Sequence, residues 1–306
     1  MSNVLSNLHV GAKLNSILFA TDLSIESRKP LRHAISIARH YGSTLFVVYV
    51  VSSLGYAMAG REAEALAVKA AERDMAEFQY DLHHLGILNG LDCYFVVLEG
   101  DIREELESIV WAKHIDLVVV GTSGRHGLDK FFLGSVAEQV FRHFTCPVLT
   151  VGPHSVEDWQ HGQAENHKPF LFITSFHEAS RKALQYAVSL ANRFEEQLVM
   201  LHVLPKKHYD ASSDATKSRE QAELLVIDHL KRLLPADVAL AKSPVFIAAS
   251  DRTAEGVLNA ASRLHAQAII MGARHAADNF IATHYPWSTA HQVIRGAECP
   301  VLTVRG

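Results

Sequence analysis

The sequence predicts an α/β protein made of two doubly wound domains, each a mostly parallel five-stranded sheet with helices on both faces. The first observation behind this prediction is a repeat within the 306 residues. Lys29 and Lys182, in matching Ser-Arg-Lys segments, lie 153 positions apart. Pro147 and Pro300, in matching Cys-Pro-Val-Leu-Thr-Val segments, are separated by the same distance. The second observation is that short apolar runs alternate with helical patterns in both copies, which indicates parallel strands joined by crossover helices.

In the first copy, the strands are short apolar runs rich in β-branched residues, as expected of strands buried on both faces. They are predicted at Ile17–Thr21, Leu45–Val51, Asp92–Leu98, Asp116–Val120 and Pro147–Val151. The helices follow from apolar residues spaced by 3, 4 and 7 positions. They are predicted at Ser27–Tyr41, Arg61–Leu85, Ile102–Lys113 and Val136–Phe144. The second copy has strands predicted at 170–174, 198–204, 244–249, 267–271 and 300–304.

The same pattern predicts the domain organisation. The first domain is expected over residues 1–152 and the second over 169–306. The polar stretch 153–168 contains proline, glycine and several histidines, and is predicted to be a linker.

The charge, the cysteines and the apolar runs of the chain exclude several classes of function. The net charge is −4, from 29 basic and 33 acidic residues, so a nucleic-acid partner is not expected. Cys93, Cys146 and Cys299 form no CxxC spacing, which argues against a disulfide framework and suits a reducing compartment. The N-terminus has no signal-like apolar stretch, and the longest apolar runs are far below the ~20 residues of a membrane helix. We therefore expect a cytoplasmic protein that neither crosses nor binds a membrane.

The segment after the fourth strand is unusual. Glycines at Gly121, Gly124 and Gly134 allow close backbone approach to a ligand, and Ser135 begins a helix whose free N–H groups attract anions. Positive charge is added locally by Arg125, His126 and Lys130. These features predict a phosphate-bearing ligand with its anionic end at the start of this helix.

A reading without a ligand is also open. The first two glycines would then serve a tight turn, and Ser135 with Glu138 would form a capping box. Neither GxxxxGK[ST] nor GxGxxG after a strand occurs, so the chain is predicted to be neither a P-loop ATPase nor a Rossmann dehydrogenase.

The run Gly121-x2-Gly124-x9-Gly134-Ser135 resembles the G-2x-G-9x-G-S/T pattern of ATP-binding universal stress proteins. The segments Ile17–Ser24 and Cys146–Val151 are similar to the opening and closing strands of that family. The resemblance covers both halves. It implies a tandem universal stress protein with the adenine nucleotide alpha hydrolase-like fold.

The resemblance also implies a nucleotide site in the first copy. The first strand would face the adenosine, the second would read the adenine through its backbone, and the glycine segment would hold the ribose and phosphates. The residues at the matching positions, with Arg125 added for its charge, are Ala20, Asp22, Val50, Gly121, Gly124, Arg125, Gly134, Ser135 and Val136. For two of these a plain structural role is open: Asp22 as the cap of the following helix, and Val50 as core.

The second copy departs from the pattern. Phe176, His275 and Trp287 are aligned with an acidic residue and two glycines of the first copy, so this copy is predicted not to bind ATP and to act as a structural partner. Although His275, His284 and His291 are close in sequence, their spacing matches no metal motif, and metal binding is not expected. Cys146 and Cys299 are predicted to be small buried packing residues.

The expected function is an ATP-binding stress-response or regulatory protein. Asp22 and Asp129 are candidates for holding Mg²⁺ beside the phosphates. Neither a nucleophile–base pair nor GxSxG is found, so hydrolysis is expected to be slow at most. Two other readings stay open: a nucleotide hydrolase or nucleotidyl transferase using the same cleft, and a dimerisation scaffold that binds no nucleotide. The last strand of each half would end its sheet, and an exposed edge invites pairing. The resemblance implies pairing through this strand, as a homodimer or an internal pseudo-dimer.

Overall fold

The protein is described from a computed structural model. The structure describes residues 11–53, 60–122, 133–155, 168–175, 177–206, 220–221, 223–228, 245–273 and 288–306. The chain forms two compact units. The N-terminal unit contains Lys13–Gln160, and the C-terminal unit contains Met1–Ala12 and His161–Gly306. Ala12 contacts the C-terminal unit, since the Ser189 hydroxyl donates to the Ala12 carbonyl oxygen at 3.0 Å.

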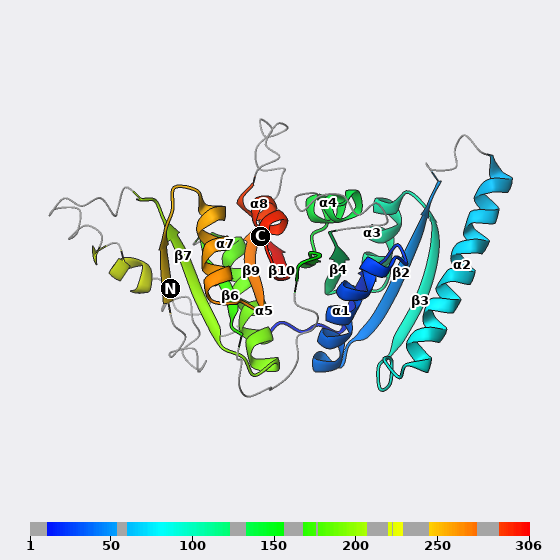
Figure 1. Cartoon of the computed structure of the whole chain (residues 1–306), viewed down its shortest axis with the longest axis horizontal. Helices are drawn as coiled ribbons and strands as arrows, with labels where there is room; N and C mark the ends of the chain where they lie inside the picture. The colour runs from blue at the N-terminus through cyan, green and yellow to red at the C-terminus, as the bar shows by residue number, and fades with distance from the viewer. Residues whose placement is uncertain are drawn as a thin grey trace, which may run out of the picture. The chain divides into compact units, whose positions relative to one another are not determined.

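The N-terminal unit alternates strands and helices, as predicted (Figure 1). Its elements are β1 (Ser16–Ala20), the 3-10 turn η1 (Ile25–Ser27), α1 (Arg28–Tyr41), β2 (Thr44–Ser52), α2 (Arg61–His84), β3 (Cys93–Gly100), α3 (Ile102–Ala112), β4 (Leu117–Gly121), α4 (Ser135–His143) and β5 (Val148–Val151). The strands follow the order β3-β2-β1-β4-β5, and every pair is parallel.

The C-terminal unit repeats this plan. Its elements are β6 (Phe170–Ile173), α5 (Glu178–Arg193), β7 (Leu198–Leu204), β8 (Val245–Ala249), α7 (Thr253–Arg263), β9 (Ala268–Ala273), α8 (Thr289–Gly296) and β10 (Val301–Arg305). The strands follow the order β10-β9-β6-β7-β8, again in parallel pairs. Helices cover both faces of each sheet, which confirms the predicted α/β architecture (Figure 1).

Local sequence explains where several elements begin and end. In β1, Ile17, Leu18 and Phe19 are fully buried, as expected of a central strand packed on both faces. Helix α1 ends at Gly42, whose φ of 68° a glycine adopts without strain and whose N–H donates to the Ala38 carbonyl. Helix α3 begins at Asp101, whose carboxylate accepts from two backbone N–H groups of the first turn.

Three cysteines are free, and two of them differ in burial from one copy to the other. Cys299 is buried, as predicted, but Cys146 is only half-buried, so the expectation of a buried packing role was wrong for the first copy.

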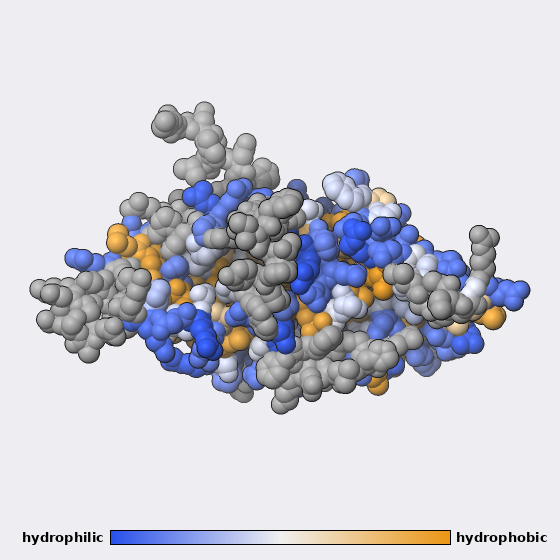
Figure 2. Space-filling model, turned by 90° about the horizontal axis from the view of Figure 1, so that it is seen from above, coloured by the Kyte–Doolittle hydropathy of each residue, from blue (hydrophilic) through white to orange (hydrophobic). Residues whose placement is uncertain are grey.

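Apolar residues lie among hydrophilic ones on the face shown in Figure 2. Within the described residues, no helix is both long enough and apolar enough to cross a membrane.

The hydrogen bonds of the two central strands fix how the copies correspond. Thr21 N donates to Val48 O at 3.0 Å, and Thr174 N donates to Leu201 O at the same distance. This register matches Asp22 with Ser175, one position before Phe176, so the predicted pairing of Asp22 with Phe176 was wrong. The acidic group is still lost in the second copy, but its replacement is a small hydroxyl. Phe176 itself lies outside the described residues.

Candidate nucleotide site at the carboxyl edge of the N-terminal sheet

The strand order of the N-terminal unit reverses between β1 and β4, because the chain goes from β1 to β2 on one side and returns to β4 on the other. Ligands of doubly wound sheets bind beyond the carboxyl ends of the strands at this point. Ala20 is level with Val48 and with Val120. Two residues further along each strand, the chain therefore places Asp22, Val50 and Thr122 at one edge.

Asp22 is held in place by the residues that follow it. Its Oδ1 atom accepts from Ser24 N at 3.0 Å, from Ser24 Oγ at 2.6 Å and from Ser27 Oγ at 2.6 Å. Between them, Leu23 has a φ of 60°, which is uncommon for a residue with a side chain. Asp22 is not the cap of the following helix, since Ser24 is the N-cap of η1 and Ser27 is that of α1. The same bonds nevertheless fix its carboxylate at the sheet edge.

Val50 is both a core residue and a candidate for contacting a ligand through its backbone. Its side chain is 8% exposed. Val48 O faces β1, since it accepts from Thr21 N, and backbone groups two residues further along a strand point to the same side. Val50 therefore directs its N–H and C=O towards the space beyond the end of β1, where no described residue pairs with them.

The start of α4 is anchored to β4 through two backbone groups. Gly134 N donates to Thr122 O at 2.8 Å, and Thr122 N donates to Val151 O at 3.0 Å. A Cβ atom at Gly134 would lie 3.0 Å from Thr122 O, so a side chain there would force the helix away from the sheet. Because φ of Gly134 is −56°, the glycine is needed for close approach and not for backbone freedom.

The capping box predicted as an alternative is not formed. Gly134 is the N-cap of α4, and among the described residues no side chain caps this helix. Glu138 instead pairs with Arg142, one turn along, at 2.6 Å. Ser135 is the first helical residue, is exposed, and its hydroxyl has no hydrogen-bond partner in the described part of the chain. The first N–H groups of α4 consequently point to the sheet edge without a side-chain acceptor.

The structure thus brings together seven of the nine predicted residues: Ala20, Asp22, Val50, Gly121, Gly134, Ser135 and Val136. Gly124 and Arg125 lie outside the described residues, as do His126, Asp129 and Lys130. Sequence reasoning missed Thr122, which anchors α4 through its carbonyl, and the Ser24 and Ser27 hydroxyls, which hold Asp22. A backbone anchor leaves no signal in side-chain type, whereas the Asp-x-Ser-x-x-Ser spacing could have shown the hydroxyls.

The same edge differs in the C-terminal unit. Ser175, in place of Asp22, shares a hydrogen bond of 3.1 Å with the Ser180 hydroxyl. The first turn of α5 packs against Gly272, since a Cβ atom there would lie 2.5 Å from the Ala179 carbonyl carbon and 2.6 Å from Ser180 N. Helix α8 also begins differently: Ser288 is its N-cap, and its hydroxyl accepts from His291 N at 3.2 Å. This helix start has its own acceptor.

The predicted histidine cluster is only partly within the description. His291 is a buried residue of α8, and His275, His284 and Trp287 lie outside the described residues. Within the described ranges, no three His, Cys, Asp or Glu side chains are grouped to hold a metal ion.

Comparison with known proteins agrees with the repeat of one domain along the chain. The model of the "Universal stress protein family" matches twice, at residues 13–152 and 166–305. A universal stress protein of Methanocaldococcus jannaschii is 33% identical over 138 residues, which are 44% of this chain and 80% of that protein. Universal stress protein A homolog 1 of Coxiella burnetii is 33% identical over 145 residues, which are 44% of this chain and 94% of that protein.

Some solved structures resemble nearly the whole chain. The crystal structure of a universal stress protein from Archaeoglobus fulgidus has a TM-score of 0.67 at 20% identity, and the match covers 96% of this chain and 99% of that one. This likeness shows the fold of both units.

Proposed function

The chain belongs to the universal stress protein family as a tandem of two such domains, and on that basis we propose that its N-terminal unit binds an adenine nucleotide, ATP first of all, in the cytoplasm. The nucleotide acts as a ligand of a stress-response or regulatory protein. The C-terminal unit binds no nucleotide in this manner.

The open start of α4 is the observation that carries the proposal. The N–H groups of its first turn lack a side-chain acceptor among the described residues, and the positive end of the helix dipole lies with them. A phosphate group would accept these hydrogen bonds and balance that charge. The Ser135 hydroxyl is placed to donate to the same phosphate, and the Gly134–Thr122 bond keeps the helix start at the sheet edge.

The other end of the nucleotide would lie along β1 and β2. Val50 offers one backbone donor and one acceptor beyond the end of β1, which suits the edge of an adenine ring. Asp22 is the acidic group closest in register, and its bonds to Ser24 and Ser27 hold it there before a ligand arrives. Such preorganisation lowers the ordering cost of binding.

The C-terminal unit lacks the corresponding features. Its acidic position is Ser175, and its helix start is capped by Ser288. A phosphate at α8 would have to displace the Ser288 cap. We therefore expect one nucleotide per chain.

Binding without efficient turnover is the expected chemistry. At the described edge, Asp22 contributes a carboxylate, but its Oδ1 atom already accepts three hydrogen bonds. Mg²⁺ would therefore be held mainly by the phosphates, as is usual for this ion. The protein's own residues orient the nucleotide and neutralise its charge.

Paired aspartate variants test the proposal. Ser135→Asp places a negative charge at the first position of α4. There the charge is stabilised by the positive end of the helix dipole, but it repels a phosphate. Titration calorimetry of the full chain should give one ATP site, and the variant should bind at least about tenfold more weakly. Ser288→Asp is the matched control in the other copy, and it should bind like the unchanged chain.

Two results would contradict the proposal. Equal ATP affinity in the Ser135→Asp and Ser288→Asp variants would show that α4 does not contribute to the site. Two equivalent ATP sites per chain would show that the C-terminal unit binds ATP as well. Phosphate release from saturating Mg-ATP should stay near background. Rapid metal-dependent turnover that Asp22→Ala abolishes would favour the nucleotide hydrolase.

A further inference from the structure

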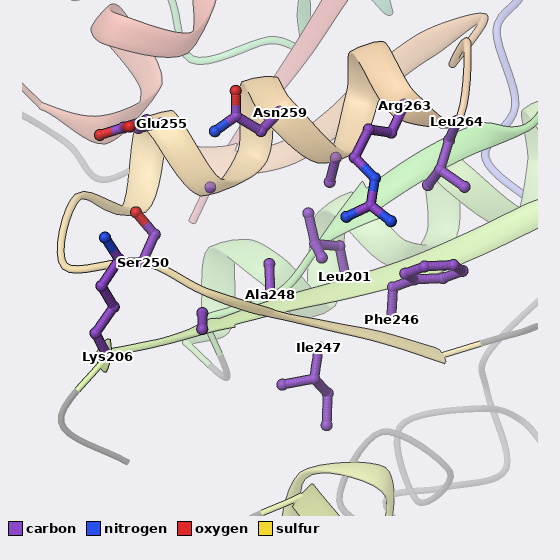
Figure 3. A pocket seen from close by; sticks show the side chains of 13 residues that line it. Leu201, Lys206, Phe246, Ile247, Ala248, Ser250, Glu255, Asn259, Arg263 and Leu264 are labelled. Carbon is purple, nitrogen blue, oxygen red and sulfur yellow. The ribbon is translucent and has the colours of Figure 1, made fainter. Parts of the chain in front are cut away.

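The C-terminal unit contains a cavity of about 480 Å³ between α7 and strands β7 and β8. Figure 3 shows its arrangement: Leu201, Phe246 and Ala248 lie on the strand side, facing α7, whereas the Ile247 side chain points to the other face of β8. Ligand pockets typically measure about 300–1,000 Å³ and combine apolar walls with a few polar groups. The cavity is remote from the α4 edge in sequence and belongs to the other unit.

The repeat shows why the cavity exists in this copy. Ala248 pairs with Val203 as Leu98 pairs with Val50, so alanine stands where the first copy has leucine. Helices α3 and α7 each have 11 residues, and aligning them from their starts matches the buried Leu106 with the buried Val257.

In that alignment, two more positions lining the cavity lose bulk. Ala260 stands where the first copy has Ile109, a side chain only 9% exposed, and Gly256 stands where it has Glu105. Phe246 is larger than its counterpart Val96, but it is 40% exposed and lies towards one end of the cavity (Figure 3). Among the described residues, smaller side chains therefore stand where Leu98 and Ile109 lie in the first copy.

The cavity cannot close by a shift of the helix towards the sheet. A Cβ atom at Gly256 would lie 2.9 Å from Val203 Cγ1 and 3.0 Å from Ser250 Cβ, so helix and sheet are already in contact there. Small residues elsewhere along α7 then leave space that the structure cannot recover by collapse, which is the condition under which a cavity persists.

The two ends of the cavity differ in the charged side chains that line them. In Figure 3 the Arg263 guanidinium extends from α7 towards the strands, beside Leu201 and Phe246, while Lys206 and Glu255 lie at the other end near Ser250. Arg263 replaces Ala112 of the first copy in the alignment of α3 with α7. Within the described part of the chain, the side chains of Lys206, Glu255 and Arg263 form no ion pair.

We propose that this cavity is a second ligand site, which binds a small organic anion: a carboxylate or sulfonate on an aromatic or branched apolar body. The acid group pairs with the Arg263 guanidinium, which suits planar carboxylates through two parallel hydrogen bonds. The body of the ligand covers Leu201 and Ala248.

The test uses 2-naphthoate as the probe and 2-naphthamide as its neutral analogue, each titrated into the full chain. We expect the naphthoate to bind about tenfold or more tightly than the amide, because only the acid forms the charged pair. Arg263→Ala should remove that preference. Ala260→Ile, which restores the residue of the first copy, should abolish binding of both compounds while ATP binding to the N-terminal unit is unchanged.

The control is Lys182→Ala, which removes one positive charge from α5 of the same unit and should leave naphthoate affinity as it was. Circular dichroism shows whether the Ala260→Ile variant is folded. Should that variant misfold, Ala248→Leu, which restores the other residue of the first copy, replaces it. Absence of naphthoate binding at millimolar concentration, or binding unaffected by Ala260→Ile and Ala248→Leu, would overturn the proposal. Neither result depends on whether ATP binds.

Discussion

The two serines at the helix starts give the sharpest test of the α4 geometry. Ser288→Ala removes the acceptor of His291 N and leaves a helix start without a cap. Replacing an N-cap serine by alanine typically costs about 1 kcal/mol. The bond is 3.2 Å long, at the weak end of the range, so we expect about 0.5–1 kcal/mol for α8. Ser135→Ala removes no cap from α4, and alanine favours a helix by a few tenths of a kcal/mol over serine.

Hydrogen exchange measured by mass spectrometry separates these effects, because peptides from α4 and α8 report on their own helices. In the nucleotide-free chain, Ser288→Ala should speed exchange in α8 about two- to fivefold. Ser135→Ala should leave α4 exchange unchanged or slightly slower. The same Ser135→Ala variant should bind ATP more weakly, because the phosphate loses one hydroxyl donor.

The outcome that would refute this reasoning is specific. If Ser135→Ala accelerates exchange in α4 as strongly as Ser288→Ala does in α8, then Ser135 caps its helix in solution. The start of α4 would not be open, and the physical basis for phosphate binding there would be lost.

Two further predictions concern packing and thiol chemistry. Gly134→Val forces a Cβ atom against Thr122 O and breaks the hydrogen bond that anchors α4. Urea denaturation should therefore show that the free energy of unfolding falls by about 1–3 kcal/mol, and calorimetry should show a large loss of ATP affinity. An unchanged free energy of unfolding would contradict the role of this bond as an anchor. Burial raises the pKa of the Cys93 and Cys299 thiols from 9.0 to about 12. The native chain then keeps protons that the unfolded chain releases above pH 9, so stability falls as the pH rises from 9 towards 12. Iodoacetamide at pH 8 should modify the buried Cys299 only after unfolding, whereas the half-buried Cys93 should react slowly in the native chain. Rapid labelling of Cys299 in the native chain would disprove its burial.

The fold could be predicted because the sequence pattern that indicates it occurs in both copies. The apolar runs and the helical spacing each occur twice, and the observed elements differ from the predicted ones by one or two residues at most of their ends. Helix α4, predicted at Val136–Phe144, spans Ser135–His143 because its start is fixed by a backbone bond to Thr122 that no side chain reveals.

The register of the repeat could not be predicted from the apolar pattern. A strand buried on both faces has no alternation, so Ile17-Leu-Phe reads equally well against Leu171-Phe-Ile or one residue earlier. The 153-residue spacing of Lys29 and Lys182 favours the second alignment, and the matching bonds of Thr21 and Thr174 to the neighbouring strands show that it is the correct one. The capping box failed for a related reason: the spacing permits Glu138 to reach back, but Arg142 offers a charged partner one turn away.

The differences between the copies are easier to explain together than separately. At the carboxyl edge, the C-terminal unit has gained the polar contacts that a ligand would otherwise supply, through Ser175 with Ser180 and through the Ser288 cap. Under α7, the same unit has Ala248 and Ala260 where the first copy has a leucine and an isoleucine, and it has gained Arg263. A domain that served only as a structural partner would be expected to keep its packing, since each lost buried side chain costs stability. The cavity beside Arg263 is therefore what we expect if, as we propose, the second copy exchanged one ligand site for another.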